Sequence, residues 1–252
     1  MPRITPSMAS TSETRALNRG LRAARAGVAA DDPDAAADAI LAALHEAVPA
    51  PPARRRPLVL SGCIRSGKTL LAQRLARDMS CPFLPGDRLR YLYRRLAQEP
   101  QRNRLRWRLL RRLLRTAPGG LIVEGADLAH RNQAPYGGTG GVTLRLLRHL
   151  RRAGLAEVAV VGNADTCVAD KRRAIEAWRA TGECWTTRPA VAGHYADPAA
   201  IEALARSTIR RSRVLRKQAA AAGIPYLEIR PEAFEADIAA HTATLRAWLE
   251  PE

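Results

Sequence analysis

The stretch Leu58–Ala76, LVLSGCIRSGKTLLAQRLA, decides the fold of this chain. It consists of a short apolar run, a loop bounded by glycines, and a segment whose leucines recur at helical spacing. The loop Gly62–Thr69 matches the pattern G-x-x-x-x-G-K-[ST] at every fixed position. A chance match in a Gly-rich chain, or a loop for another anion, is the alternative. The strand before the loop and the helix after it favour a phosphate-binding loop.

Each residue type in this loop has a physical role. The glycines let the backbone fold tightly, so that successive N–H groups and the N-terminal end of the next helix converge on a β-phosphate. Lys68 is expected to reach the β- and γ-phosphates, and the Thr69 hydroxyl to ligate Mg²⁺. ATP and Mg²⁺ are therefore the expected cofactors, and the predicted nucleotide-binding residues are Gly62, Cys63, Ile64, Arg65, Ser66, Gly67, Lys68, Thr69 and Leu70.

The positive charge of the chain is concentrated in one quarter of it. The 252 residues carry a net charge of +17, and residues 57–118 alone hold 15 basic and 3 acidic groups, a net charge of +12. Residues 191–252 are balanced. A local basic surface indicates a local anionic partner more strongly than a high pI does. Nearly all the basic residues are arginines in a chain rich in Ala, Gly and Pro, so the preference for Arg over Lys is typical of a GC-rich genome.

Composition also excludes several classes of protein. At 46% hydrophobic the chain has enough apolar material for one domain with an extension, or at most two small domains. No apolar run approaches the roughly 18 residues of a membrane span, and no secretion signal follows the N-terminus. We therefore expect a soluble, cytoplasmic protein. The four cysteines are scattered without a C-x-x-C pair, so neither a zinc site nor a disulfide framework is indicated.

Short apolar runs alternate with helical patterns after residue 57, which predicts a parallel sheet buried on both faces. Strands are expected at 58–60, 82–84, 121–123, 158–161 and 224–229. Helices are expected at 68–79, 88–98, 102–116, 142–152, 170–181, 198–222 and 232–249. The predicted fold class is α/β, a P-loop NTPase of three layers (α/β/α) with a five-stranded parallel sheet. Residues 1–56 are predicted as an N-terminal helical arm and a Pro/Arg linker, with helices at 14–30 and, capped by Asp34, up to Val48.

Several kinds of P-loop protein lack their signatures here. A GTPase needs an N-K-x-D motif on a late strand, but Gly162-Asn163-Ala164-Asp165 has no lysine after the asparagine and is interpreted as a strand-end turn. No L-S-G-G-Q signature of ABC ATPases occurs. The motor ATPases usually place Asp-Glu after an apolar strand, whereas the strand 121–123 is followed by Glu124-Gly125. A small kinase fits better.

Four segments together resemble the nucleoside-monophosphate-kinase-like group, which includes shikimate and gluconate kinases, chloramphenicol phosphotransferase and the zeta toxins. They are Gly62–Thr69, Gly86-Asp87-Arg88, Glu124-Gly125 and the basic segment Lys171–Arg188. The tail, with Ala222–Tyr226, is similar to bacterial P-loop kinase-like proteins of unassigned substrate. The resemblance covers about residues 57–250. It implies a kinase-like domain at 57–252, with an acceptor-covering segment at about 88–118 and a lid at about 165–197.

The resemblance also implies a catalytic set around the loop. Asp87 follows the second strand, so we expect it beside the first strand at the carboxyl edge of the sheet, where it would contact the acceptor hydroxyl and act as base. The alternative is a cap on the next helix. Glu124 would hold a Mg²⁺-bound water or the acceptor, unless it is only a strand-end acid. In the lid, Arg173 and Arg179 are the arginines proposed to neutralise the transferred phosphoryl group.

Arginines in the acceptor-covering segment are the candidate acceptor ligands, because guanidinium forks match phosphate and carboxylate groups. They are Asp87's neighbours Arg88 and Arg90, with Arg104 and Arg108 from an arginine stripe on helix 102–116. A solvated helix face is the alternative for that stripe. Trp178 is assigned either to adenine stacking or, preferably, to the core.

The prediction is therefore a Mg²⁺/ATP-dependent kinase that phosphorylates a hydroxyl or phosphate of a small anionic acceptor. One alternative is a polynucleotide kinase or other nucleic-acid enzyme, which the +12 segment favours. Aromatic residues make up only 4% of the chain, so stacking platforms for single strands are scarce. The other alternative is a non-catalytic ATP-binding regulator.

Overall fold

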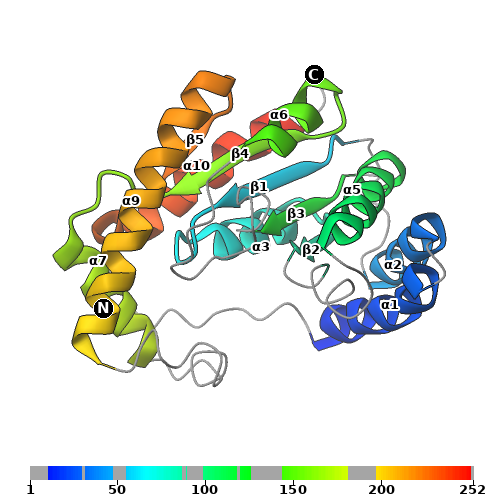
Figure 1. Cartoon of the computed structure of the whole chain (residues 1–252), viewed down its shortest axis with the longest axis horizontal. Coiled ribbons are helices and arrows are strands. Elements are labelled where there is room, and N and C mark those ends of the chain that lie inside the picture. Colours follow the sequence, from blue (N-terminus) through cyan, green and yellow to red (C-terminus); the bar gives the residue numbers. More distant parts are fainter. Residues whose placement is uncertain are drawn as a thin grey trace.

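A five-stranded parallel sheet forms the centre of the molecule, with helices packed on both of its faces (Figure 1). The computed structural model describes residues 11–29, 32–47, 55–86, 89, 99–117, 120–125, 144–180 and 197–250. In spatial order the strands are β2 (Phe83–Pro85), β3 (Ile122–Gly125), β1 (Leu58–Gly62), β4 (Glu157–Gly162) and β5 (Tyr226–Glu228). The predicted three-layer α/β/α class, with a five-stranded parallel sheet and a helical N-terminal region, is confirmed.

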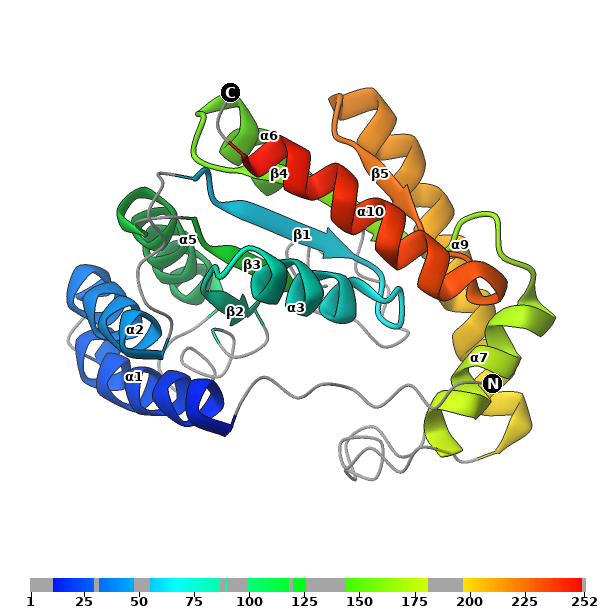
Figure 2. The ribbon, with the colours of Figure 1, turned by 180° about the vertical axis from the view of Figure 1, so that it is seen from behind.

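Alternate residues of the central strand enter different cores, because successive side chains of a strand point to opposite faces. On one face Leu58 and Leu60 pack with α3 (Lys68–Asp78) and α10 (Phe234–Leu249), which contact each other and lie in front of the sheet in Figure 2. On the other face Val59 packs in a cluster to which the two helices of the N-terminal arm and three helices of the sheet domain contribute. The three helices of the sheet domain are α5 (Glu99–Thr116), α6 (Arg145–Arg152) and α9 (Pro198–Ala222).

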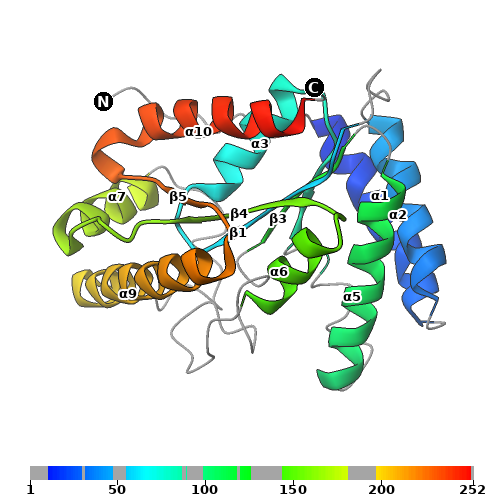
Figure 3. The ribbon, with the colours of Figure 1, turned by 90° about the horizontal axis from the view of Figure 1, so that it is seen from above.

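The N-terminal arm is a helical hairpin of α1 (Thr11–Ala29) and α2 (Pro33–Ala47) that packs against α5 (Figure 3). The two helices approach so closely at Gly20 that a Cβ there would lie 2.5 Å from the Cβ of Ala43. The predicted cap of α2 was wrong by two residues. Asp32, not Asp34, accepts the N–H groups of residues 34 and 35 at 3.1 and 3.0 Å, because the helix already begins at Pro33.

Strand order corrects one sequence expectation about the site. The position after β2 does not lie beside β1, because β3 stands between the two strands and pairs with both. Order within a parallel sheet depends on how each crossover helix packs, and consecutive strands need not be neighbours. Asp87, two residues after the end of β2, lies outside the described residues.

Two further helices complete the described carboxyl side of the sheet. The chain after β4 forms α7 (Val168–Ala180), and α9 packs against α7 before it leads to β5. A short 3-10 helix, η3 (Pro231–Ala233), joins β5 to α10. The observed strands and helices lie within a few residues of the predicted ranges, and the predicted helix 88–98 falls almost wholly outside the described residues. Among the described residues, none of the helices combines the length and apolar character needed to cross a membrane.

Candidate phosphate-binding site

The loop between β1 and α3 has a backbone that only particular residues tolerate. Gly62 has a φ of 148°, and a Cβ at this position would lie 1.9 Å from the carbonyl oxygen of Val161 on the neighbouring strand. Arg65 and Gly67 also have positive φ angles, of 60° and 84°. Such changes of backbone hand turn successive N–H groups to one side of the loop and form an anion-binding concavity. The N-terminus of α3 begins directly after it, at Lys68.

Two polar side chains inside the loop have environments suited to an anion. Lys68 is buried, and its Nζ donates to the carbonyl oxygen of Cys63 at 3.2 Å. Ser66 is 1% exposed, and its hydroxyl is buried without a hydrogen-bond partner in the described structure. A buried hydroxyl without a partner costs free energy unless a ligand or water supplies one. The loop therefore holds a cation and an unsatisfied donor at the place where a phosphate group is expected.

A carboxylate from the neighbouring strand meets the end of the loop. The Thr69 hydroxyl donates to Oε2 of Glu124 at 2.7 Å, and Glu124, on β3, is 4% exposed. Ser61 Oγ donates to the carbonyl oxygen of Gly125 at 2.9 Å and ties the same two strands together. Hydroxyl and carboxylate oxygens are the ligand types that Mg²⁺ prefers. Within the described part of the chain, no group of three or more His, Cys, Asp or Glu side chains is arranged to hold a metal ion.

The opposite flank of the loop contacts a buried lysine. Lys171, on α7, is 3% exposed, and its Nζ donates both to the carbonyl oxygen of Arg65 and to Oδ1 of Asn163, the latter at 2.7 Å. Asn163, just after β4, also donates its Nδ2 to the carbonyl oxygen of Ile229. Its backbone N–H donates to Oγ of Ser212 on α9 at 3.0 Å. One asparagine thus connects α7, α9 and the segment after β5 behind the loop.

Burial shifts the protonation of this flank. Desolvation lowers the pKa of Lys171 to about 7, and the cations of Arg65 and Lys68 act in the same direction, while Cys63 and Glu228 oppose the shift. Desolvation also raises the pKa of the Cys63 thiol, against a hydrogen bond with Ser212 and the nearby lysines. Burial therefore favours the neutral form of the Cys63 thiol.

The side chain of Arg65 lies on an aromatic ring of α7. Its guanidinium carbon stands 3.5 Å from the centroid of the Trp178 ring, a cation–π arrangement. Trp178 also packs with Ile64 and with the small cluster built around Ile175 between α7 and α9. Of the two assignments for Trp178, the structure shows the packing role, with the loop arginine as its stacking partner.

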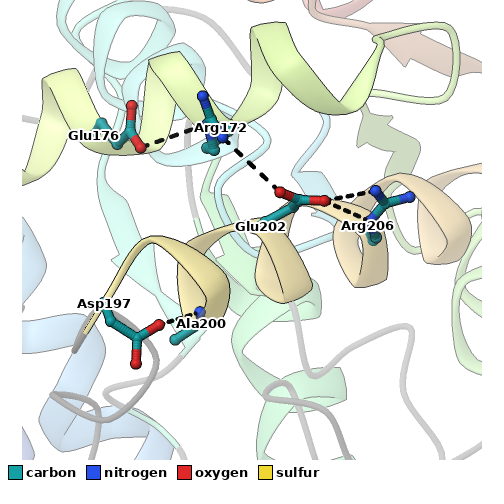
Figure 4. Close-up of polar contacts among 6 residues, drawn as sticks. All are labelled: Arg172, Glu176, Asp197, Ala200, Glu202 and Arg206. Atoms are coloured by element: carbon teal, nitrogen blue, oxygen red, sulfur yellow. Dashed lines mark hydrogen bonds and ion pairs between the residues drawn. The ribbon is translucent and has the colours of Figure 1, made fainter.

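The predicted lid arginines take part in surface contacts. Arg173 pairs with Asp170 one turn earlier and is 68% exposed at its side chain, and Arg179 is exposed. Their neighbour Arg172 reaches Glu176 at 3.6 Å and Glu202 of α9 at 3.9 Å, and Glu202 in turn pairs with Arg206 at 2.5 Å (Figure 4). Asp197 caps α9 by accepting the N–H of Ala200 at 2.7 Å (Figure 4). The described part of the predicted lid, α7, is thus linked to α9.

The predicted acceptor residues are largely outside the described structure. Asp87, Arg88 and Arg90 are not described, nor is the side chain of Arg104. Arg108 is exposed on α5, which lies at the opposite end of the molecule from α7 (Figures 1 and 3). A neighbouring arginine of α5, Arg112, contacts Asp34 and Asp38 of the arm at 3.6 and 3.7 Å. One described contact of the arginine-rich helix therefore joins it to the arm.

Sequence reasoning missed the residues that hold the α7 flank. Asn163 was interpreted as part of a strand-end turn, and Lys171 only as one member of a basic segment. Two signals pointed to them. A polar residue directly after a buried parallel strand lies at the ligand-binding edge of the sheet. Lysine is also rare in this chain, where only Lys68, Lys171 and Lys217 occur among 41 basic residues.

Comparison with known proteins gives similarity of fold only. No protein-family model and no curated protein sequence matches the chain. Among solved structures it is similar to a shikimate kinase from Bacteroides thetaiotaomicron, with 12% sequence identity, a TM-score of 0.49, and coverage of 76% of this chain and 98% of that one. It is also similar to a protein provisionally described as a kinase from Chloroflexus aurantiacus, with 15% identity, a TM-score of 0.41, and coverage of 77% and 96%. The functional conclusion therefore depends on the residues of the site.

Proposed function

We propose that this chain is a Mg²⁺/ATP-dependent phosphotransferase that transfers the γ-phosphoryl group to a hydroxyl or phosphate of a small anionic acceptor. The observation that carries the proposal is the junction of the loop with β3. There the hydroxyl of Thr69, the residue after Lys68, lies 2.7 Å from the carboxylate of Glu124 on β3. A hydroxyl and a buried carboxylate at the end of a phosphate-binding loop are the partners that phosphoryl transfer requires for a bound Mg²⁺.

In this proposal each part of the loop has one task. Backbone N–H groups of residues 62–70 and the Ser66 hydroxyl bind phosphate oxygens, and Lys68 leaves the Cys63 carbonyl to contact the β- and γ-phosphates. Thr69 and Glu124 hold Mg²⁺, which when bound neutralises charge on the phosphate oxygens. Positioning and charge stabilisation of this kind account for most of the catalysis of phosphoryl transfer.

The acceptor side of the proposal rests on sequence. Asp87 would orient the acceptor hydroxyl and take its proton, with Arg88, Arg90, Arg104 and Arg108 as ligands for the acceptor's negative charge. Arg173 and Arg179 are proposed to approach the transferred group. The exchange of Arg173 from Asp170 to a phosphate would cost little, because exposed ion pairs contribute only about 0–1 kcal/mol.

The proposal is tested by ATP binding and ATP turnover with a metabolite panel, for the wild type, Lys68→Ala and Asp87→Asn. Lys217→Ala, an exposed lysine on α9, is the matched control. We expect Lys68→Ala to lose nucleotide affinity and turnover by at least about 100-fold, Asp87→Asn to lose mainly turnover, and the control to match the wild type. Full ATP binding and turnover by Lys68→Ala would overturn the assignment.

The same assay separates the two alternatives. Stimulation by RNA or DNA, with an affinity that falls steeply with salt, would indicate a nucleic-acid substrate. Nucleotide binding without turnover for any acceptor, but with nucleotide-dependent binding of a partner, would indicate a regulator.

A further inference from the structure

Two side chains of helix α7, one near each end of the helix, contact the same residue of the phosphate-binding loop. Lys171 and Trp178 are seven residues apart and so lie on one face of the helix, two turns from each other. Lys171 binds the carbonyl oxygen of Arg65, and Trp178 lies under the guanidinium of the same residue. Between them Ile175, 2% exposed, packs in the cluster shared with α9. The face of α7 toward the loop therefore contacts both the backbone carbonyl and the side chain of Arg65.

The hydrogen bond from Lys171 to the Arg65 carbonyl also fixes the direction of the next N–H group of the loop. A trans peptide unit is planar, with its C=O and N–H groups pointing in opposite directions. When Lys171 holds the Arg65 carbonyl, the N–H of Ser66 therefore points away from Lys171, in the opposite direction within the same peptide plane. Arg65 has a φ of 60°, a conformation that costs a non-glycine residue roughly 1–2 kcal/mol, so the peptide needs such support.

Lys171 also places a second buried ammonium group behind the loop. Its long-range partners include Cys63, Arg65 and Lys68 from the loop and Glu228 from β5. Around it, Arg211 of α9 acts on Cys63, and η3, which packs on α7, carries the exposed Glu232. Three of these groups are cations, and the carboxylate that acts on Lys171, Glu228, already accepts N–H groups of Ala164 and Asp165 at 3.0 Å each. An added anion in the loop would relieve this excess of positive charge.

We propose that Lys171 is a positioning residue of the phosphate-binding loop, which orients the Arg65–Ser66 peptide and makes the affinity for phosphate depend on its own charge. This inference rests on the function proposed above and deepens it. Phosphate binding favours the ammonium form, so the nucleotide and the proton on Lys171 stabilise one another. Affinity is then highest at acidic pH and falls as the pH rises through about 7, where the nucleotide-free chain releases this proton.

The experiment is calorimetric titration with MgADP at pH 6.5 to 9, in pairs of buffers that differ in ionisation enthalpy. The variants are Lys171→Met, which keeps the length of the side chain and removes its charge, and Lys217→Met as the exposed-lysine control. Above pH 7.5 the phosphates of ADP have already lost their protons, so proton uptake there reports on the protein. Any protons that ADP itself still exchanges contribute equally to all variants, so they cancel when the variants are compared.

For the wild type and Lys217→Met we expect a fraction of a proton to be taken up per MgADP above pH 7.5. Their affinity should fall on the order of tenfold between pH 7 and 9. Lys171→Met should bind more weakly at pH 7, show no such uptake, and have a nearly flat pH profile. If Lys171→Met does not fold, the inference is tested by whether the wild type takes up protons on binding MgADP above pH 7.5.

Absence of that uptake, or the same uptake in Lys171→Met, would overturn the inference while leaving the proposed function intact. Failure of the wild type to bind MgADP at any pH would overturn both.

Discussion

On its β3 side the phosphate-binding loop meets a carboxylate, whereas on its α7 side it meets an ammonium group. The first flank is built from two hydrogen bonds to β3, one from Thr69 at the start of α3 to Glu124 and one from Ser61 on β1 to the Gly125 carbonyl. The second draws on α7, α9 and the segments after β4 and β5, all joined through Asn163. The loop thus lies between oxygen ligands suited to a metal ion and a buried cation suited to phosphate. In the proposed function the β3 flank serves the chemistry, and the α7 flank holds the loop in shape.

The largest effect should come from neutralising the carboxylate of the β3 flank. Glu124→Gln keeps the side chain's shape but removes its charge, so we expect ATP turnover to fall by at least about 100-fold and the Mg²⁺ requirement to rise, with little change in stability. Steady-state turnover against Mg²⁺ concentration measures both. Glu157→Gln is the control. It removes a carboxylate at the amino end of β4, away from the loop, whose only ion pair among the described contacts is with exposed Arg56, and it should leave turnover unchanged. Wild-type turnover in Glu124→Gln would remove the metal role from this flank.

The second effect concerns stability and should be larger on the α7 flank. Asn163→Ala leaves Lys171 and the Ile229 carbonyl without a partner that each now has, which should lower the free energy of unfolding by about 2–4 kcal/mol. Ser61→Ala removes one neutral hydrogen bond and should cost about 1 kcal/mol. Urea denaturation of both variants gives the two values. A larger loss for Ser61→Ala would reverse the proposed division between the flanks.

The pH dependence of stability should report on Lys171. Its pKa is about 7 in the folded chain and near 10.4 when unfolded, so between these values the unfolded state binds more protons. The free energy of unfolding of the wild type, relative to that of Lys171→Met, should therefore rise by about 2 kcal/mol as the pH increases from 7 to 9. Denaturation at several pH values measures the slope, and Lys217→Met should follow the wild type. Parallel profiles for wild type and Lys171→Met would mean that Lys171 titrates normally.

The smallest expected effect is on the stacking of Arg65. Arg65→Met keeps the apolar stem and removes the guanidinium from the face of Trp178, which should cost about 0.5–1 kcal/mol and lower Tm by about 1–4 °C. Arg115→Met, on the exposed surface of α5, serves as the control and should leave Tm nearly unchanged. Equal shifts in the two variants would show that the α7 flank does not use this contact.

Local pattern was enough for much of the fold. The loop, its strand and its helix were predictable because they are contiguous in the chain, and Leu109, Leu110, Leu113 and Leu114 are buried as the spacing on helix 102–116 predicts. The sequence predicts Thr69 and Glu124 at the carboxyl edge of the sheet, and their side-chain oxygens lie 2.7 Å apart there; their role as metal ligands stays a prediction. Within α3, Leu71 and Leu75 are fully buried, whereas Leu70 is only half-buried.

What pattern could not predict depends on neighbours distant in sequence. The position of β2 outside β3 follows from the packing of crossover segments. The role of Asn163 requires residues 8, 49 and 66 positions away to converge on it. Lys171 and Arg173 are indistinguishable in a basic run, yet one is buried against the loop and the other is exposed beside Asp170.

The sequence by itself determined that this chain forms a phosphate-binding loop in a parallel α/β sheet, because that loop, its glycines and the elements beside it are encoded within about twenty residues. Only the tertiary structure decided which charge lies on which side of the loop. Glu124 reaches it through strand pairing, and Lys171 through the packing of α7 on α9. Burial then changes the chemistry of the lysine, since an ammonium removed from water loses the solvation that keeps its pKa near 10.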